Sequence, residues 1–388
     1  MTTAPHTIVR DATLPDTAAR PRECAVISLL NTPAGLFRWY EEFPQRISGH
    51  LQEAGIDHIV GYKSYLDNTT IPAHARLTAH DETDMVDPAW VSATLGPIVA
   101  RYRRVIVHTH SYAFGECAVW RLCRTSATRS WWATMHRTPR PGSGLRALSR
   151  RVLQYGRCVY PDRLFGCSSA SQQALQAMFI PSRVGLLRNG RLSDGDMQMF
   201  PPRAQPCVAL FVGRLTREKG VFALLQAAAI LASQHPRFRL LIVGDGPEEA
   251  AMRQWIAAQR LEATIDMLGY RADVETCYAQ ADFLIIPTDP ALVAEGLPLV
   301  ALEAKAFALP VIYSRSGGLP ESQVEGETGI VVDPPDAPDI ARAAAALMGD
   351  VERYHAMRES IRRERVRWGI DAMAQAYVRE YQAAFGRR

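Results

Sequence analysis

The sequence lacks the features of a membrane-spanning or disulfide-bonded protein. No segment offers about 18 uninterrupted apolar residues, the length that a transmembrane helix needs. The first 23 residues contain no apolar core of signal-peptide length. The 7 cysteines are scattered and form no CxxC pair, which argues against a disulfide framework and against a zinc site. We therefore expect a cytoplasmic protein that neither enters nor spans a membrane.

Other absences restrict the ligands. No tandem repeat of solenoid length is visible. The stretch GDGPE (residues 244–248) is superficially like a dinucleotide loop, but GxGxxG is absent and no acidic residue is placed to bind a ribose, so we reject NAD. No cluster of metal ligands appears, and we expect neither a metal nor a resident cofactor.

The length of 388 residues predicts two domains of similar size, and an apolar fraction of 47% with 22% charged residues is typical of a globular protein. We expect residues 1–22 to form a disordered tail, residues 23–200 a first domain and residues 205–366 a second. The polar, proline-bearing residues 194–206 have no helix or strand period and predict the linker.

The net charge is only +4, but one segment is locally basic. Residues 137–163 contain seven arginines and one acidic residue, Asp162; the arginines are Arg137, Arg140, Arg146, Arg150, Arg151, Arg157 and Arg163. A solvated, arginine-rich surface explains this run about as well as contact with an anionic membrane, which we keep as a secondary hypothesis. Nucleic-acid binding is not expected, because the run lacks the interleaved aromatic residues of a base-stacking surface.

From Cys207 onward, short apolar runs alternate with amphipathic segments. CVALFVGRL, RLLIVGDG, IDMLGY, DFLIIPT and LPVIYS predict strands, and residues 221–233, 248–259 and 273–281 predict helices. This alternation is typical of a doubly wound, parallel α/β sheet, so we predict a Rossmann-like domain. The first half repeats the pattern less regularly and predicts a second domain of the same kind. Residues 369–385 predict an amphipathic helix.

The stretch EGLPLVALE (residues 295–303) places an acidic residue at each end of an apolar run, just after a predicted strand. Pro298 suits the first turn of a helix, so Glu295 is expected in the loop and Glu303 more than one turn into the helix. The free amides near Leu299 and Val300, together with the helix dipole, form a site for a phosphate. A sugar nucleotide fits this arrangement, with Glu303 binding ribose hydroxyls and Glu295 the transferred sugar. A single glutamate here would more often be a cap or a dipole partner.

Cations and histidines follow other predicted strands. In GRLTREKG, Arg214 and Lys219 are expected to face the same site and to stabilise a diphosphate leaving group, although loop cations are common at surfaces. In RVIVHTH, His108 and His110 lie on one side of a strand, where a ligand contact and a hydrogen-bonded core role are about equally expected. His136 is a weaker candidate of the same kind, with a structural or acceptor-side role.

Several of these segments together resemble the nucleotide-binding half of the retaining glycosyltransferases of family 4, which have the GT-B fold. FVGRLTREKG, LLIVGDGPE, DFLIIPT, EGLPLVALEAKAFALPVIYSRSGGLPES and GETGIVVDP carry the resemblance, in order, over roughly residues 207–350. The first half is similar only at the glycine loop of Gly35, the HxH at His108 and His110, GCSSAS (residues 166–171) and RNG (residues 188–190). This chain has Ala34-Gly35 and Leu297-Pro298 where the family often has a double glycine and phenylalanine-glycine.

The resemblance implies two Rossmann-like domains that face each other across a cleft, with a C-terminal helix (residues 367–388) that packs back on the first domain. It implies that His110, Arg214, Lys219 and Glu295 are the catalytic residues. Its implied donor-binding residues are Gly35, Arg214, Lys219, Gly269, Tyr270, Arg271, Glu295, Gly296, Leu297, Leu299, Val300 and Glu303. Within this set, Gly269 to Arg271 would line the nucleobase and His110 would contact the sugar. Transfer would occur with retention, by front-face attack from the acceptor, without a nucleophilic carboxylate.

These observations predict a transferase that uses a nucleoside-diphosphate sugar, and a UDP- or GDP-sugar is the expected donor. The expected product is a polysaccharide, a lipid-linked glycan or another glycoconjugate. For such a function, peripheral attachment to the inner face of the membrane through residues 137–163 is a further hypothesis. One alternative is a soluble transferase that acts on a small acceptor, such as a natural-product aglycone, a cyclitol or a sugar phosphate. A second is a non-catalytic protein that binds sugar nucleotides, against which the presence of all four charged positions argues.

Overall fold

The structure is a computed structural model that describes residues 22–30, 38–62, 88–110, 117–139, 161–191 and 205–386. The predicted N-terminal tail, the glycine loop at Gly35, and most of the linker and of the arginine-rich run lie outside the described residues. Within these ranges, no helix is long and apolar enough to cross a membrane. Over the same ranges, no group of three or more histidine, cysteine, aspartate or glutamate residues is arranged to hold a metal ion.

A six-stranded parallel sheet organises the first lobe, with the strand order β2-β1-β3-β4-β5-β6. Its strands are β1 (Arg22–Leu30), β2 (Asp57–Tyr62), β3 (Tyr102–His110), β4 (Arg129–Met135), β5 (Arg163–Gly166) and β6 (Val184–Leu186). The accompanying helices are α1 (Arg38–Glu53), α2 (Pro88–Thr94), α3 (Gly96–Val99), α4 (Cys117–Arg124), α6 (Ser169–Met178) and the 3-10 turn η1 (Pro181–Arg183).

A second six-stranded parallel sheet organises the second lobe, with the order β12-β11-β10-β7-β8-β9. Its strands are β7 (Val208–Val212), β8 (Arg239–Val243), β9 (Ile265–Gly269), β10 (Phe283–Ile286), β11 (Val311–Ser314) and β12 (Gly329–Val332). Its helices are α7 (Val221–Gln234), α8 (Glu249–Ala258), α9 (Val274–Gln280), α10 (Leu299–Ala306), α11 (Ala337–Gly349) and α12 (Val351–Glu364), with the 3-10 turns η3 (Arg217–Lys219) and η4 (Leu319–Ser322).

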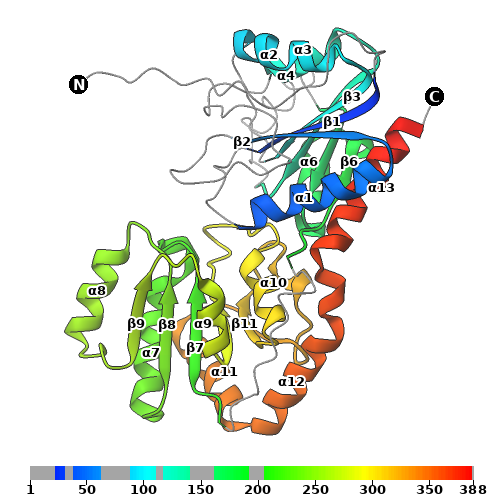
Figure 1. The fold of residues 1–388 in the computed structure, drawn as a ribbon. Coiled ribbons are helices and arrows are strands. Elements are labelled where there is room, and N and C mark those ends of the chain that lie inside the picture. The colour runs from blue at the N-terminus through cyan, green and yellow to red at the C-terminus, as the bar shows by residue number, and fades with distance from the viewer. Residues whose placement is uncertain are drawn as a thin grey trace, which may run out of the picture.

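Two parallel sheets with helices on their faces confirm the predicted α/β class and the two Rossmann-like halves (Figure 1). The strands have apolar sequences because helices cover both faces of each sheet, as in β10, where all of FLII is buried. Helix α7 can start directly after η3 because Gly220 adopts a positive φ of 72°. A Cβ at Gly220 would lie 2.0 Å from the carbonyl oxygen of Pro287, so only glycine fits there.

The C-terminal helix α13 (Ile370–Gly386) belongs to the core of the first lobe. It follows α12 and the 3-10 turn η5 (Arg365–Trp368), leaves the second lobe and lies along α1 (Figure 1). Its buried stripe joins the core formed by α1 and one face of the first sheet; the stripe consists of Ile370, Met373, Ala374, Tyr377, Val378 and Tyr381. Among the described residues, the first lobe therefore ends at Arg191, the second begins after Gln205, and the chain returns to the first lobe at η5.

A small apolar cluster joins the lobes beside the start of α10. Cys167 of the first lobe, Leu297 and Leu302 of the second, and Trp368 of η5 are all buried in it. Burial of such side chains from both lobes removes apolar surface from water only when the lobes are together. This contact places the loop before α10 directly against the first lobe.

Candidate active site

Helix α10 starts at the end of the loop that follows β10, at the carboxyl edge of the second sheet. The helix begins at Leu299 with Pro298 as its N-cap residue, one position from the predicted start. The amides of Leu299 and Val300 belong to the first turn and have no acceptor within the helix. The Leu299 side chain packs into the interlobe cluster, and that of Leu297 is buried in it, so these residues offer mainly their backbone to a ligand.

Glu295 and Lys219, which sequence reasoning placed in one site, contact each other. Lys219 Nζ donates to Glu295 Oε1 over 2.5 Å, and Thr288 Oγ1 donates to the same oxygen over 2.8 Å. The backbone of Glu295 is also fixed, because its N–H donates to Ser316 Oγ and its carbonyl accepts from the Gly318 N–H. Lys219 comes from η3, after β7, and Glu295 from the loop after the neighbouring strand β10. The topology therefore brings the pair together across 76 positions of sequence.

The other predicted donor residues lie along the same edge of the sheet. Arg214 is exposed two positions after the end of β7, and no ion pair involving it is present in the described ranges. Gly269 ends β9 with a φ of 68°, and its carbonyl accepts from the Gly244 N–H. Tyr270 follows with 54% of its surface exposed, and Arg271 is paired with Asp273. The geometry thus places a cation, a backbone turn and an exposed ring at the ends of β7 and β9.

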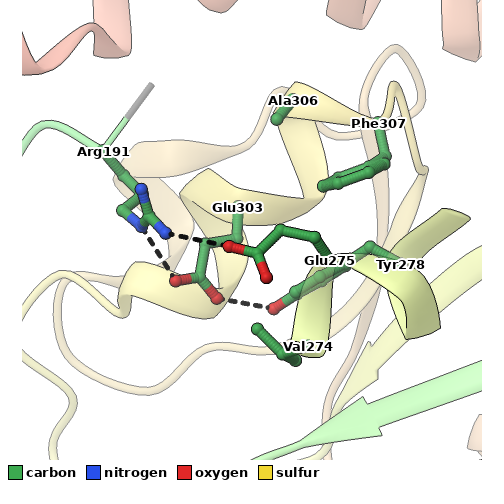
Figure 2. A pocket seen from close by; sticks show the side chains of 7 residues that line it. All are labelled: Arg191, Val274, Glu275, Tyr278, Glu303, Ala306 and Phe307. Carbon is green, nitrogen blue, oxygen red and sulfur yellow. Dashed lines mark hydrogen bonds and ion pairs between the residues drawn. The ribbon is translucent and has the colours of Figure 1, made fainter. Parts of the chain in front are cut away.

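Glu303 is held by two donors (Figure 2). Arg191 Nε donates to Oε1 over 3.0 Å, and Tyr278 OH donates to Oε2 over 2.8 Å. Burial raises the pKa of Tyr278 well above its ordinary value, with further contributions from the charge of Glu303 and the hydrogen bond to it. Tyr278 is therefore a permanent hydrogen-bond donor to this carboxylate at neutral pH.

Arg191 is a residue that sequence reasoning missed. Its guanidinium also lies 3.3 Å from Glu42 Oε2 on α1 and 3.8 Å from Glu275 Oε1 on α9. A hollow beside it is lined by Arg191, Val274, Glu275, Tyr278, Glu303, Ala306 and Phe307 (Figure 2). No local spacing in the sequence indicates these pairs, because the three glutamates lie far from Arg191 in the chain. Its position directly after RNG was the one available hint.

The first lobe approaches the loop before α10 through short contacts. Thr138 Oγ1 donates to the carbonyl of Glu295 over 2.5 Å, and Asn189 Nδ2 donates to the carbonyl of Leu297 over 3.0 Å. A Cβ at Gly296 would lie 2.2 Å from the carbonyl oxygen of His136, so glycine is needed for this approach. Gly296 therefore acts by leaving room for the first lobe. The sequence analysis assigned no role to Thr138, and it quoted Asn189 only as part of the RNG segment.

The strand-end histidines form a buried stack. His108 and His110 are stacked with ring centroids 4.5 Å apart, and those of His110 and His136 are 5.7 Å apart. His108 Nδ1 is bonded to Tyr381 OH and His108 Nε2 to Thr134 Oγ1, which matches the hydrogen-bonded core alternative for this residue.

His110 and His136 continue from this stack to the loop before α10. His110 Nδ1 lies 3.4 Å from His136 Nε2, and His136 Nδ1 lies 3.2 Å from Asn189 Oδ1. His110 Nε2 is buried and has no hydrogen-bond partner among the described side chains and backbone. The structure therefore links His110 to the loop before α10 through His136 and Asn189.

Burial of this stack predicts that the protein is less stable in acid. Burial lowers the pKa of His108 to about 3 and that of His136 to about 4, and it lowers the pKa of His110 well below 6.5. Because the unfolded chain binds these protons near pH 6.5 and the folded chain does not, the stabilisation is present above pH 6.5 and is lost as pH falls toward 4. At pH 5, which is roughly 1.5 pH units below the unfolded pKa, each buried imidazole should lower the free energy of unfolding by about 2 kcal/mol relative to neutral pH.

Urea titrations at pH 7 and pH 5 test this expectation. The loss of stability between the two pH values should shrink by about 2 kcal/mol in His108→Gln, which removes one buried ring. His355→Gln, at a partly exposed position on α12, is the matched control and should behave like the unmodified protein. A loss of equal size in all three proteins would show that the buried rings do not control acid stability.

A family model matches the second lobe of this chain. The family described as Glycosyl transferases group 1 matches residues 196–364, which include β7 to β12 and the loop before α10. In Escherichia coli K12, the putative colanic acid biosynthesis glycosyltransferase WcaL is 28% identical over 273 residues, which cover 66% of this chain and 64% of that protein. In Corynebacterium urealyticum, D-inositol 3-phosphate glycosyltransferase is 33% identical over 186 residues, which cover 45% of this chain and 42% of that protein. The match thus spans less than two thirds of either relative.

Solved structures extend the likeness to both lobes. The crystal structure of HepE from Anabaena in complex with UDP and glucose superposes with a TM-score of 0.70 at 18% identity, and the match covers 92% of this chain and 99% of that one. At that identity the likeness establishes the fold, and it confirms the predicted GT-B arrangement of two lobes.

Proposed function

We propose that this chain is a retaining glycosyltransferase that uses a nucleoside-diphosphate sugar, because residues 196–364 match the family described as Glycosyl transferases group 1. The proposed donor is a UDP- or GDP-sugar. The proposed acceptor is a hydroxyl group of a growing polysaccharide, a lipid-linked glycan or another glycoconjugate.

One observation carries the proposal: Lys219 and Glu295 meet beside the amino end of α10, where the first lobe contacts the same loop. A sugar diphosphate supplies the complementary groups, since its phosphates suit the ammonium and the free amides, and its sugar hydroxyls suit the carboxylate. With a donor bound, we expect Lys219 Nζ to turn from Glu295 toward the diphosphate, and Glu295 to accept from a sugar hydroxyl.

In the proposed reaction, the bond between the anomeric carbon and the phosphate oxygen breaks, and the acceptor oxygen bonds to that carbon on the same face. The acceptor proton passes to an oxygen of the departing diphosphate, so no carboxylate nucleophile is required. Negative charge grows on the diphosphate as the bond breaks, and Lys219, Arg214 and the amides of Leu299 and Val300 would stabilise it. Glu303 would bind the ribose through the lone pairs that Arg191 and Tyr278 leave available.

The acceptor has two candidates, each with a named relative. WcaL is assigned to colanic acid biosynthesis, which favours a polysaccharide acceptor, and the corynebacterial relative is named for D-inositol 3-phosphate, a small acceptor. We place the polysaccharide or lipid-linked acceptor first and the small acceptor second. A lipid-linked acceptor would be reached at a membrane, to which residues 137–163 would attach the protein. At low salt, a larger fraction of the protein should then sediment with anionic liposomes than with neutral liposomes.

Thermal shift against nucleotides, followed by product analysis, tests the proposal. A true donor nucleotide at roughly a hundred times its dissociation constant should add about 2.7 kcal/mol to stability. The stabilising sugar nucleotide is then incubated with the two acceptor classes, and the anomeric configuration of the product is read by NMR. Binding without transfer or hydrolysis would favour a non-catalytic sugar-nucleotide-binding protein. An inverted product would refute the retaining mechanism.

A further inference from the structure

Residues 189–191, Asn189-Gly190-Arg191, lie where the first lobe ends. They contact both ends of residues 295–303, which we call the donor segment. Asn189 reaches the carbonyl of Leu297, near the start of residues 295–303, and Arg191 reaches Glu303 at the end. The middle residue is fixed as well, since the Gly190 carbonyl accepts from Trp39 Nε1 over 2.6 Å. A Cβ at Gly190 would lie 2.4 Å from the carbonyl oxygen of Gly369. This tripeptide is therefore clamped between α1, η5 and the donor segment, and we call it the interlobe clasp.

Arg191 connects the clasp to three carboxylates from both lobes. Glu42 comes from α1 of the first lobe, while Glu275 and Glu303 come from α9 and α10 of the second. The residue is only 6% exposed, so its charge is largely removed from water. A guanidinium remains protonated at any ordinary pH and offers five donors in a rigid plane, so it can serve several acceptors at once. Its backbone N–H, which donates to the carbonyl of Trp368 over 2.9 Å, fixes the base of the side chain.

The contacts at Glu303 determine how its carboxylate is presented. Arg191 Nε holds one oxygen and Tyr278 OH the other, so the plane of the carboxylate cannot rotate freely. Each carboxylate oxygen accepts about two hydrogen bonds, which leaves one acceptor position on each oxygen. Two adjacent acceptor positions in a fixed plane suit two neighbouring hydroxyl groups. A carboxylate released from Arg191 would adopt several orientations and would bind such a pair less selectively.

We propose that Arg191 is a positioning residue that orients Glu303 for the two ribose hydroxyls of the donor and ties that orientation to the first lobe through Glu42. This inference rests on the proposed function for its ligand, but the clasp itself does not depend on any ligand. It makes the choice of ribonucleotide over deoxyribonucleotide depend on Arg191, a residue of the first lobe, as well as on Glu303.

Calorimetric titration with UDP and 2′-deoxy-UDP, or with the GDP pair, tests the positioning role. The unmodified protein should prefer the ribonucleotide by about tenfold or more, because a hydrogen bond to a charged group is lost with the 2′-hydroxyl. Arg191→Gln should reduce this preference to that of Glu303→Gln, and Arg191→Lys should restore only part of it. Glu42→Gln, which removes the negative charge on α1 and leaves the Arg191–Glu303 pair in place, should keep most of the preference. An undiminished preference in Arg191→Gln would overturn the positioning role.

Amide hydrogen exchange without nucleotide tests the clasp separately. Arg191→Gln should accelerate exchange in both α1 and α10, whereas Glu42→Gln should do so mainly in α1. Acceleration confined to residues 189–191 would overturn the clasp. If exchange behaves as expected but the unmodified protein binds neither UDP nor GDP, the clasp stands and the proposed function fails.

Discussion

Replacement of Lys219 by methionine is expected to lower the rate of sugar transfer by about a hundredfold to a thousandfold, the usual cost of removing one preorganised group that stabilises developing charge. The ammonium lies beside Glu295 and the amino end of α10, where the leaving diphosphate would collect its charge. Methionine keeps the length and the apolar stem of the side chain. The effect should therefore appear in kcat of a protein that still folds.

Initial rates with a saturating sugar nucleotide measure this effect. Arg217→Met is the matched control, because Arg217 lies two positions away on the same 3-10 turn, has a side chain 75% exposed and pairs with Glu248. Its rate should stay within about twofold of the unmodified protein, as expected for a surface pair. Glu295→Gln should be impaired like Lys219→Met. Equal rates in Lys219→Met and Arg217→Met would remove Lys219 from the catalytic machinery.

Glu364→Gln is expected to lower the free energy of unfolding by about 3–5 kcal/mol, the typical result when one partner of a buried ion pair is removed. The Lys305 side chain, at the end of α10, is fully buried and donates to Glu364 at the end of α12. Burial lowers the pKa of Lys305, and the charge of Glu364 opposes that effect. Without the carboxylate, an unpaired ammonium remains in the interior.

Chemical denaturation of three variants checks this expectation. Lys305→Met removes the charge and keeps the volume, so it should cost far less than Glu364→Gln, and the double variant should recover most of the lost stability. A lowered lysine pKa means that the unfolded chain binds the proton more readily, so stability rises with pH. The deficit of Glu364→Gln should accordingly be smaller at pH 9 than at pH 7. Similar losses in Lys305→Met and Glu364→Gln would mean that packing, and not charge, determines the effect.

The second lobe could be predicted closely because its signals are local. The helix predicted at residues 221–233 is α7 (Val221–Gln234), and the run DFLIIPT contains β10 (Phe283–Ile286). Short buried strands between amphipathic helices keep their sequence pattern wherever the tertiary neighbours lie. Helix α1 (Arg38–Glu53) is harder to predict from local signals, because it includes Pro44. Burial of Trp39 and Phe43 against the core outweighs the local cost of that proline.

The candidate site could be predicted in part. Lys219 and Glu295 were selected because they follow neighbouring strands, and strand ends of a parallel sheet share one edge. Arg191 and Asn189 were missed because their partners, Glu303 and Leu297, lie in the other lobe, and no periodicity relates residues more than a hundred positions apart. The roles of the site residues remain predictions for the experiments above.

Helix α13 has a consequence for how the protein is made. Ile370, Tyr377 and Tyr381 of this helix complete the core of the first lobe, although the helix follows the whole second lobe in sequence. Domains of long chains generally fold in order as they leave the ribosome. In this protein the apolar face of the first lobe stays uncovered until α13 has been translated, so the first lobe can complete its folding only after the second lobe has been made. A nascent chain halted before residue 370 would present that face to chaperones.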